Sequence, residues 1–394
     1  MSDATSDVAV LKPSLQARIS ELHPSLVELS EWLHAHPETA WEEHESAARC
    51  AAYLRDHGFE VEETFVGLDT AFHAVAGSGP LRIGLMAEYD ALPNIGHACG
   101  HNLIATMSLG AAVALASVAD ELGITVEVFG TPAEEGGGGK IEMLDRGAFD
   151  GLDFAMMVHP APVDAVRARP FAVEHWEITF TGRASHAGSY PTQGVNAADA
   201  FTVAEVAIGL LRQQLPSTVR VHGIVTHAGD APNAIPGHTR GRWYVRAGTM
   251  AELEETAAKV KRCFEAGALA TGCSVEIIDE SKPYSDMRTN EDALAFYRAN
   301  ALALGRELHV EGGDHGEGDP AADMCRASTD FANVSWAVPA IHPYIGVDSF
   351  PVLNHQAEFA DACVGPVAEK SLLDGATAMA WTAVDMARSL ASAS

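Results

Sequence analysis

The sequence predicts an α/β protein, in which a mostly parallel sheet is flanked by helices and interrupted by a smaller α+β sandwich. Continuous apolar runs at 81–88, 124–131 and 153–158 indicate strands that are buried on both faces. Helical patterns separate these runs, which is the order of elements expected for a parallel sheet covered by helices. From about residue 172 the strands instead alternate apolar and polar residues, which indicates a second sheet with one exposed face.

Helices are expected in the first part where apolar residues recur at helical spacing. They are 14–34, 43–57, 102–122 and 140–146. Gly58 ends the second of these helices. Within the third, the apolar stretch 105–119 is interrupted by Ser108 and Ser117, and we interpret it as a helix buried in the core.

In the second part the elements follow the order strand, helix, strand, strand, helix, strand, which is typical of a small α+β sandwich. In chain order they are 173–181, 196–214, 219–226, 239–247, 250–271 and 273–279. After Pro283 the first pattern returns, with a helix, a strand and a long Ala-rich helix at 290–304, 332–338 and 366–389. We therefore expect a discontinuous domain, 1–171 and 283–394, with an insert at 172–282.

Composition argues against several classes of partner. The net charge of −29 disfavours nucleic acid and anionic membrane surfaces, because both would repel the protein. No apolar run approaches the ~18 residues that a membrane-spanning helix needs, and the polar, acidic residues 1–12 do not resemble a secretory signal. Six cysteines lie at positions 50, 99, 263, 273, 325 and 363, without the spacing of a disulfide framework. We expect reduced thiols and a cytoplasmic protein.

The strongest chemical signal is concentrated between Ala87 and Asn102. Those sixteen positions hold one thiol, two imidazoles and two carboxylates, on Cys99, His97, His101, Glu88 and Asp90. Sulfur and nitrogen ligands beside carboxylates are what a divalent transition metal such as zinc requires. A metal bound in this segment would indicate a hydrolase.

Further candidate ligands follow the other two buried strands. Glu134 and Glu135 come shortly after the second strand, and His159 ends the third. Because function collects at the carboxyl ends of parallel strands, we expect these side chains near Cys99 and His101, which would face one side if their segment is extended. Each feature alone has an ordinary interpretation, as a structural cysteine–histidine pair, a solvated turn or a strand-end histidine. Their coincidence at three successive strand ends favours a metal site.

Several motifs make the chain similar to the M20 metallopeptidases and amidohydrolases over nearly its whole length. The segment EYDALPNIGHACGHN at 88–102 resembles the branch that includes aminobenzoyl-glutamate hydrolase subunits and aminoacylase-1-like-2 proteins and, more distantly, hippurate and auxin-conjugate hydrolases. The other motifs, in the family's order, are PAEEGGGGK at 132–140, GRASHAG at 182–188, NAIPG at 233–237, STDFANVS at 328–335 and NHQAEF at 354–359. The resemblance implies a zinc-peptidase-like catalytic domain with an inserted dimerisation and lid domain.

The resemblance also implies roles for particular residues. One or two ions of zinc or manganese, or alternatively of cobalt or nickel, would be held by Cys99, His101, Glu135, His159 and His355. Glu134 would be the general base, and Asp90 would orient a ligand. In the insert, His186 would reach into the active site of the other subunit of a homodimer and help to stabilise the oxyanion. Asn233 and Arg246 would hold the carboxylate of the substrate.

The chain departs from the family at three positions. Glu88 stands where many branches have a metal-binding histidine, and Asn102 stands where the hippurate-type branch has aspartate. Tyr244 replaces the aspartate that usually lies two residues before Arg246. These departures leave the number of metals, the identity of the metal and the substrate open. Other histidines are expected to be structural or to line a pocket, namely His97, His175, His222 and His227.

We therefore expect a homodimeric, metal-dependent hydrolase that cleaves the amide bond of an N-acyl or N-aroyl amino acid, or of a dipeptide. Bound metal would make water nucleophilic at neutral pH. One alternative is hydrolytic deamination of an aromatic amine at the same site. Another is a binding protein without catalysis, against which the intact ligand set speaks, since a degenerate site should have lost at least one ligand.

Overall fold

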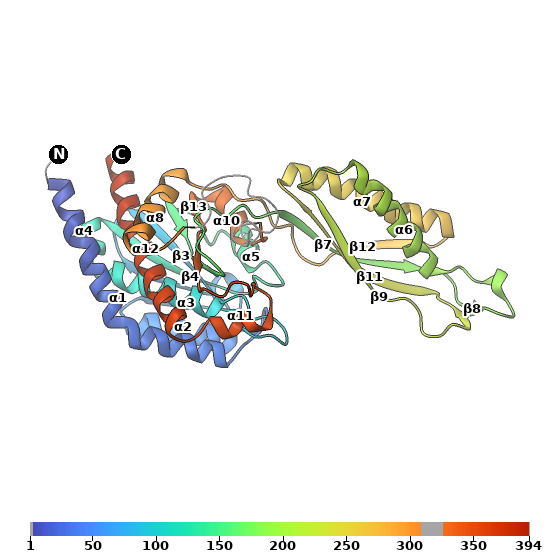
Figure 1. Ribbon diagram of the computed structural model, residues 1–394, viewed down its shortest axis with the longest axis horizontal. Coiled ribbons are helices and arrows are strands. Elements are labelled where there is room, and N and C mark those ends of the chain that lie inside the picture. The colour runs from blue at the N-terminus through green and yellow to red at the C-terminus, as the bar shows by residue number, and fades with distance from the viewer. Residues whose placement is uncertain (1–2, 309–325, 394) are drawn as a thin grey trace. The chain divides into compact units, whose positions relative to one another are not determined.

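The computed structural model describes residues 3–308 and 326–393, which form two compact units (Figure 1). Unit 1 consists of Met1–Arg169 and Met287–Ser394, and unit 2 is the segment between them, Pro170–Asp286. Each unit has its own hydrophobic core. Of the six cysteines, the five in the described residues are free thiols, and Cys325 lies outside the described residues.

Unit 1 is built on a sheet of six strands in the order β1-β2-β4-β3-β5-β13. These strands are β1 (Glu60–Glu63), β2 (Phe72–Gly77), β3 (Leu81–Glu88), β4 (Ile124–Thr131), β5 (Phe154–Met156) and β13 (Ala340–Ile341). Strand β3 is central and pairs in parallel with both β4 and β5, and β13 is parallel to β5. Strands β1 and β2 add an antiparallel edge beside β4. The predicted α/β class is confirmed, although the sheet is mixed.

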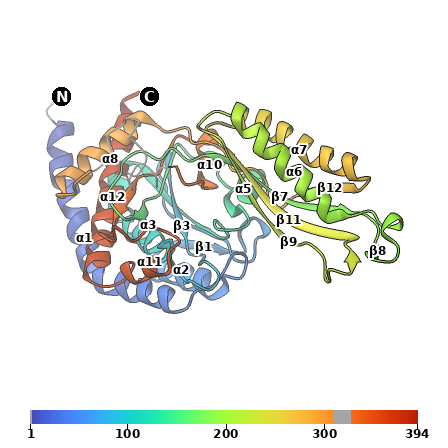
Figure 2. The same cartoon turned by 45° about the vertical axis from the view of Figure 1, so that its right-hand side comes forward.

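Helices cover both faces of this sheet. The helices that the structure describes in unit 1 are α1 (Asp3–Ala35), α2 (His44–Asp56), α3 (His101–Ala116), α4 (Ala119–Leu122), α5 (Gly139–Asp145), α8 (Glu291–Ala303), α10 (Phe331–Ala337), α11 (Ala357–Ala362) and α12 (Pro366–Ala393). Successive strand residues point to opposite faces. Leu85 and Val128 therefore pack in the core formed with α1, α3 and α12, which lie side by side (Figures 1 and 2), whereas Met86 and Phe129 pack with Phe331 of α10.

Two expected elements differ in the structure. The strand predicted at 332–338 is wrong, because all of these residues except Val338 belong to α10, and the returning strand is β13, which follows the helix. Phe331, Val334 and Val338 are buried at helical spacing, while Trp336 is 54% exposed, so the short apolar run has one buried side, as a helix does. The expected helix 102–122 is divided into α3 and α4.

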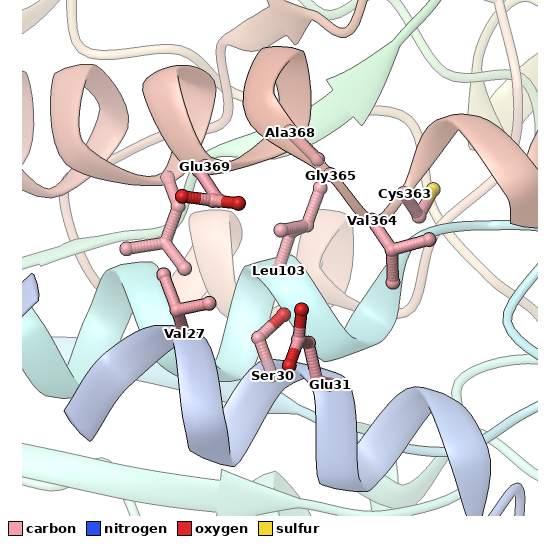
Figure 3. Close-up of a pocket in the computed structure, with 10 residues that line it drawn as sticks. Val27, Ser30, Glu31, Leu103, Cys363, Val364, Gly365, Ala368 and Glu369 are labelled. Carbon is pink, nitrogen blue, oxygen red and sulfur yellow. The ribbon is translucent and has the colours of Figure 1, made fainter. Parts of the chain in front are cut away.

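A small cavity lies where α1, α3 and the start of α12 meet (Figure 3). Val27, Ser30 and Glu31 of α1 line one side, and Leu103 and Glu369 line others. Its volume of about 10 Å³ is no more than one water molecule needs, so it offers no room for a substrate.

Unit 2 is an antiparallel sheet of four strands in the order β12-β7-β11-β9, covered on one face by two helices. The elements are β7 (Ala172–Thr181), β9 (Arg220–His227), β11 (His238–Ala247), β12 (Ser274–Asp279), α6 (Ala197–Leu211) and α7 (Met250–Thr271). Helices α6 and α7 lie side by side in both views (Figures 1 and 2) and bury Trp176, Phe180 and Trp243 of the sheet. A two-stranded ribbon of β8 (Ser185–His186) and β10 (Ala234–Ile235) completes the unit.

Two further short strands of unit 1, β6 (His159–Ala161) and β14 (Tyr344–Gly346), pair in parallel with each other. Short 3-10 turns occur at Phe65–Gly67, Pro191–Gln193 and Arg212–Gln214. Among the described residues, no helix combines the length and the apolar character needed to cross a membrane.

Candidate metal centre

The carboxyl ends of the neighbouring strands β4, β3 and β5 bring the predicted ligands of unit 1 together. Three overlapping groups have ligand atoms that all lie within 4.8 Å of one another. The first group is Cys99, His101 and His159, the second is Cys99, Glu135 and His355, and the third is His101, Glu134 and Glu135. Six side chains from four segments of unit 1 thus converge on one small volume.

Individual distances show how tightly these side chains are packed. The sulfur of Cys99 lies 3.5 Å from Nε2 of His159. Nε2 of His101 lies 3.7 Å from Oε1 of Glu135, and the same oxygen lies 3.3 Å from Nε2 of His355. Sulfur, nitrogen and oxygen donors therefore face one another across a space suited to a cation.

A tight turn at Gly100, rather than an extended segment, puts Cys99 and His101 on one side. Gly100 has a φ of 81°, and helix α3 starts at the next residue. A Cβ atom at position 100 would lie 2.8 Å from Cγ of Pro160 and 3.1 Å from the sulfur of Cys363. Only glycine combines this left-handed backbone with so close an approach.

Asp90 fixes the orientation of His101. One carboxylate oxygen of Asp90 lies 3.0 Å from Nδ1 of His101, and the other accepts a hydrogen bond from the backbone N–H of Glu135 at 2.9 Å. Although burial alone would raise the pKa of Asp90, the interaction with His101 holds that pKa below its ordinary value. The ring of His101 therefore donates through Nδ1 and presents Nε2 to the other ligands.

Buried polar atoms without hydrogen-bond partners indicate that a cation fits this site. Within the described residues, Nε2 of His101 and Oε1 of Glu135 are buried and lack hydrogen-bond partners. Burial and the neighbouring Glu135 raise the pKa of Glu134, and burial together with Cys99 raises the pKa of Glu135 to about 7. Burial opposes ionisation of Cys99, but His159 and His355 lower the pKa of its thiol. A divalent metal would neutralise these crowded carboxylate and thiolate groups, and it would bind the buried atoms that lack hydrogen-bond partners.

Two residues of the site, a candidate ligand and the residue before Glu134, have unusual backbone conformations. His355 has a φ of 67°, and its N–H donates to the carbonyl of Ala98 at 2.8 Å. Ala133, directly before Glu134, has a φ of 58°, and its N–H donates to the carboxylate of Glu43 at 2.8 Å. Non-glycine residues rarely adopt such angles, and they cluster at functional sites when surrounding contacts hold them.

The structure adds residues that sequence reasoning missed. Glu43 is fully buried beneath the Glu134 turn, and Asn354 donates to the carbonyl of Pro160 at 3.1 Å, next to Cys99. Lys140 and Asp330 form a buried ion pair at 2.7 Å. Lys140, Asp330 and Asn354 lie within the motifs that carry the family resemblance. Their position in those motifs is the feature of the sequence that marks them as candidate site residues.

Asn102, one of the departures from the family pattern, has a structural explanation. Its side-chain amide donates to the hydroxyl of Ser30 at 2.9 Å and to the carbonyl of Cys363 at 3.0 Å. An ionised aspartate has no hydrogen to donate to that carbonyl. Asn102 thereby joins α1, α3 and the segment before α12.

The insert residues belong to unit 2. His186 and Asn233 are neighbours there, since His186 pairs with Ala234 in the β8–β10 ribbon. Nδ1 of His186 accepts hydrogen bonds from the N–H groups of Gly188 and Ser189 at 3.2 and 3.0 Å. In the neutral ring the proton is therefore on Nε2, which can donate.

Arg246 lies on β11, on the face away from the helices. Its guanidinium lies 3.4 Å from Nε2 of His222 and 5.9 Å from the ring centre of Tyr244. His175 stacks edge-on against Tyr244 at 4.3 Å. In the described residues, none of the three groups of candidate metal ligands includes His97, His175, His222 or His227.

Comparison with known proteins is consistent with these features. The chain is 39% identical to an Xaa-Arg dipeptidase of Mus musculus over 402 residues, covering 98% of this chain and 91% of the relative. It is 28% identical to one of the subunits of the p-aminobenzoyl-glutamate hydrolase of Escherichia coli K12, covering 91% and 88% of the two chains.

Solved structures share the fold. An aminobenzoyl-glutamate utilization protein from Klebsiella pneumoniae superposes with a TM-score of 0.72 at 19% identity, covering 94% of this chain and 98% of the other. A dinuclear metal-binding peptidase of the M20 family from Bacillus subtilis superposes with a TM-score of 0.64 at 21% identity, covering 94% and 99%. The model of peptidase family M20/M25/M40 matches residues 84–380. The chain belongs to this family and is a metal-dependent peptidase or amidohydrolase.

Proposed function

We propose that the protein hydrolyses the amide bond of a dipeptide or N-acyl amino acid and releases the C-terminal amino acid. The observation that carries this proposal is the buried convergence of thiol, imidazole and carboxylate groups around Cys99, His101 and Glu135. The relatives support the substrate class, because one is named for dipeptides ending in arginine and another for an aroyl-glutamate. The greater similarity to the first makes a dipeptide with C-terminal arginine the first substrate to test.

The proposed metal ligands are Cys99, His101, Glu135, His159 and His355. Two of the observed groups share Cys99, which supports a pair of ions, as in the dinuclear Bacillus subtilis peptidase of the same fold. Imidazole and thiolate suit zinc, while the carboxylate also suits manganese. A bound divalent metal supplies a Lewis acid, which lowers the pKa of water from 15.7 to about 7.

Glu134 is proposed as the general base. Its Oε2 lies 4.0 Å from Nε2 of His101, within one of the three ligand groups. Burial and the charge of Glu135 raise the pKa of Glu134, which favours retention of a proton once it has been accepted. Glu134 would take a proton from the attacking water and deliver it to the nitrogen of the leaving amine.

Residues of unit 2 are proposed to hold the substrate and to join two copies. The Nε2–H of His186 would donate to the oxyanion in the site of a second copy. Asn233 and Arg246 would bind the C-terminal carboxylate, for which the planar guanidinium can make paired hydrogen bonds. We propose a homodimer formed through this unit. The free cysteines support a reducing, cytoplasmic setting.

Release of products from a substrate panel tests the proposal. Xaa-Arg dipeptides, aminobenzoyl-glutamate and N-acetyl amino acids would be incubated with metal-loaded protein, and the released amino acid and ammonia quantified. We expect the amino acid, loss of activity with a chelator, and recovery with zinc or manganese. Ammonia from an aromatic amine as the main product would instead favour deamination.

The variant Glu134→Gln tests the mechanism. Removal of a general base lowers kcat by about 10²–10⁴-fold, and we expect that loss with unchanged metal content. Metal content by mass spectrometry is the control. Full activity of the metal-stripped protein, or of this variant, would contradict the mechanism.

A further inference from the structure

A buried ion network lies beside the candidate metal ligands. It consists of Glu88 at the end of β3, Lys140 at the start of α5 and Asp330 directly before α10, and all three residues are fully buried. Nζ of Lys140 lies 2.6 Å from Oε1 of Glu88 and 2.7 Å from Oδ1 of Asp330. The N–H of Lys140 donates to the second oxygen of Asp330 at 2.9 Å.

Glu88 connects this network to the metal centre. While Oε1 of Glu88 is held by Lys140, Oε2 lies 3.7 Å from Nε2 of His101. That is the distance between the same nitrogen and Oε1 of the proposed ligand Glu135. Glu88 nevertheless belongs to none of the three ligand groups found in the described residues. The carboxylate of Glu88 therefore lies next to the ligands without being one of them.

The charges of this network determine which cation pairs with Glu88. A buried carboxylate needs a cation or several hydrogen-bond donors, because its desolvation is costly. In this network the ammonium of Lys140 is the cation for both Glu88 and Asp330. With all three groups ionised, the network has a net charge of −1. Without Lys140 the charge would be −2, and the nearest cation for Glu88 would be the metal.

We propose that Lys140 is a positioning residue of the metal centre, which holds Glu88 away from the metal and thereby preserves the cysteine-containing ligand set. The inference rests on the proposed function, since it requires a metal at Cys99, His101 and Glu135. The proposal gives the buried lysine a measurable effect on which metal the site prefers. Four of the five proposed ligands offer sulfur or nitrogen, which favours zinc, and an additional carboxylate would shift the preference toward manganese, because manganese favours oxygen ligands.

Metal binding by the full-length protein, without any substrate, tests the proposal. Zn²⁺ and Mn²⁺ would be titrated in competition into stripped protein, and the visible absorption of the Co²⁺-loaded protein would report the coordination number. In Lys140→Met we expect the Mn²⁺-to-Zn²⁺ affinity ratio to rise by about tenfold or more, as Glu88 becomes a ligand. The Co²⁺ bands should weaken, because added ligands move cobalt away from tetrahedral geometry.

A double variant provides the matched control. Lys140→Met combined with Glu88→Gln restores the net charge of −1 and removes the anionic oxygen, so it should show the wild-type ratio and spectrum. Lys140→Gln, which can still hydrogen-bond to Asp330, serves as a second neutral variant if the methionine variant does not fold.

Three outcomes would overturn the inference. A folded neutral variant with the wild-type ratio and spectrum would show that Lys140 has no effect on the ligand set. A double variant as altered as Lys140→Met would assign the effect to structural damage. Wild-type protein that binds none of the three metals would overturn the proposed function, and this inference with it.

Discussion

At the scale of single residues, burial of Glu43 links the stability of unit 1 to its functional turn. The carboxylate accepts a hydrogen bond from the N–H of Ala133, which holds a left-handed conformation directly before Glu134. Burial, and secondarily the charge of Asp90, raises the pKa of Glu43 from 4.5 to about 7. The protonated form is therefore the one that the folded protein favours.

Glu43 should make stability depend on pH. Because its pKa in the folded state is raised, its contribution is complete below pH 4.5 and is lost as pH rises through about 7. A shift of this size corresponds to at most about 3 kcal/mol. In the wild-type protein, deprotonation of Glu43 should lower the free energy of unfolding as pH rises from 4.5 to 8. In Glu43→Gln, whose side-chain oxygen can still accept the hydrogen bond from the N–H of Ala133, we expect this decrease to be absent. Urea unfolding of both proteins across this range, at fixed metal concentration, measures it, and identical pH profiles would refute the assignment.

At the scale of elements, the start of α3 determines the geometry of two proposed ligands. Gly100 turns the chain so that Cys99 precedes the helix and His101 is its first residue. Helix α3 is buried along almost its whole length, packed between the sheet, α1 and α12. A rigid, buried helix therefore carries His101, and a tight turn carries Cys99.

Substitution of Gly100 should damage the site more than the fold. In Gly100→Ala, the positive φ and the contacts with Pro160 and Cys363 should cost about 1–3 kcal/mol and reduce metal affinity at least about tenfold. The matched control is Gly209→Ala in α6, where a Cβ atom meets nothing within 4 Å and stability should rise by about 0.5–1 kcal/mol. Thermal unfolding and metal titration measure both effects. Unchanged metal affinity in Gly100→Ala would contradict this account of the turn.

At the scale of the whole molecule, the division into two units separates the proposed ligands from the proposed substrate-binding residues. All ligand candidates belong to unit 1, whereas His186, Asn233 and Arg246 belong to unit 2. Each unit has its own core, so each can support its part of the site. The proposed roles would therefore draw on residues of both units and, in the proposed homodimer, of two copies.

Mixing of two inactive variants tests whether His186 acts in a second copy. His186→Ala and Glu134→Ala proteins would be unfolded, mixed in equal amounts and refolded together. About half of the dimers would contain one copy of each variant. In such a dimer one of the two sites combines an intact Glu134 with an intact His186 from the other copy, so about a quarter of wild-type activity should return. Each variant refolded alone is the control. No recovery in a mixture shown to contain mixed dimers would contradict action between copies.

Local patterns predict much of the fold. Strands β3 and β4 and helix α7 have the bounds expected from the sequence. The two strands are continuous apolar runs that begin after Pro80 and Gly123, and the helix has a clear period and ends before Gly272. The strand prediction for the short run at 332–338 is wrong, since seven apolar-rich residues fit either period. Strands β1 and β2 have no counterpart among the expected elements, because a short, largely polar edge strand such as β1 lacks a distinct pattern.

The sequence by itself determined the α/β class, the family and the candidate ligands, because these depend on local periodicity, on motifs and on the convergence of parallel strand ends. Only the tertiary structure revealed the contacts between distant segments around those ligands. Glu43 meets Ala133 across 90 positions, and Lys140 meets Asp330 across 190. No local pattern encodes such pairs. They form because folding buries polar and charged groups, and such a group is stable in the core only where another segment supplies its partner.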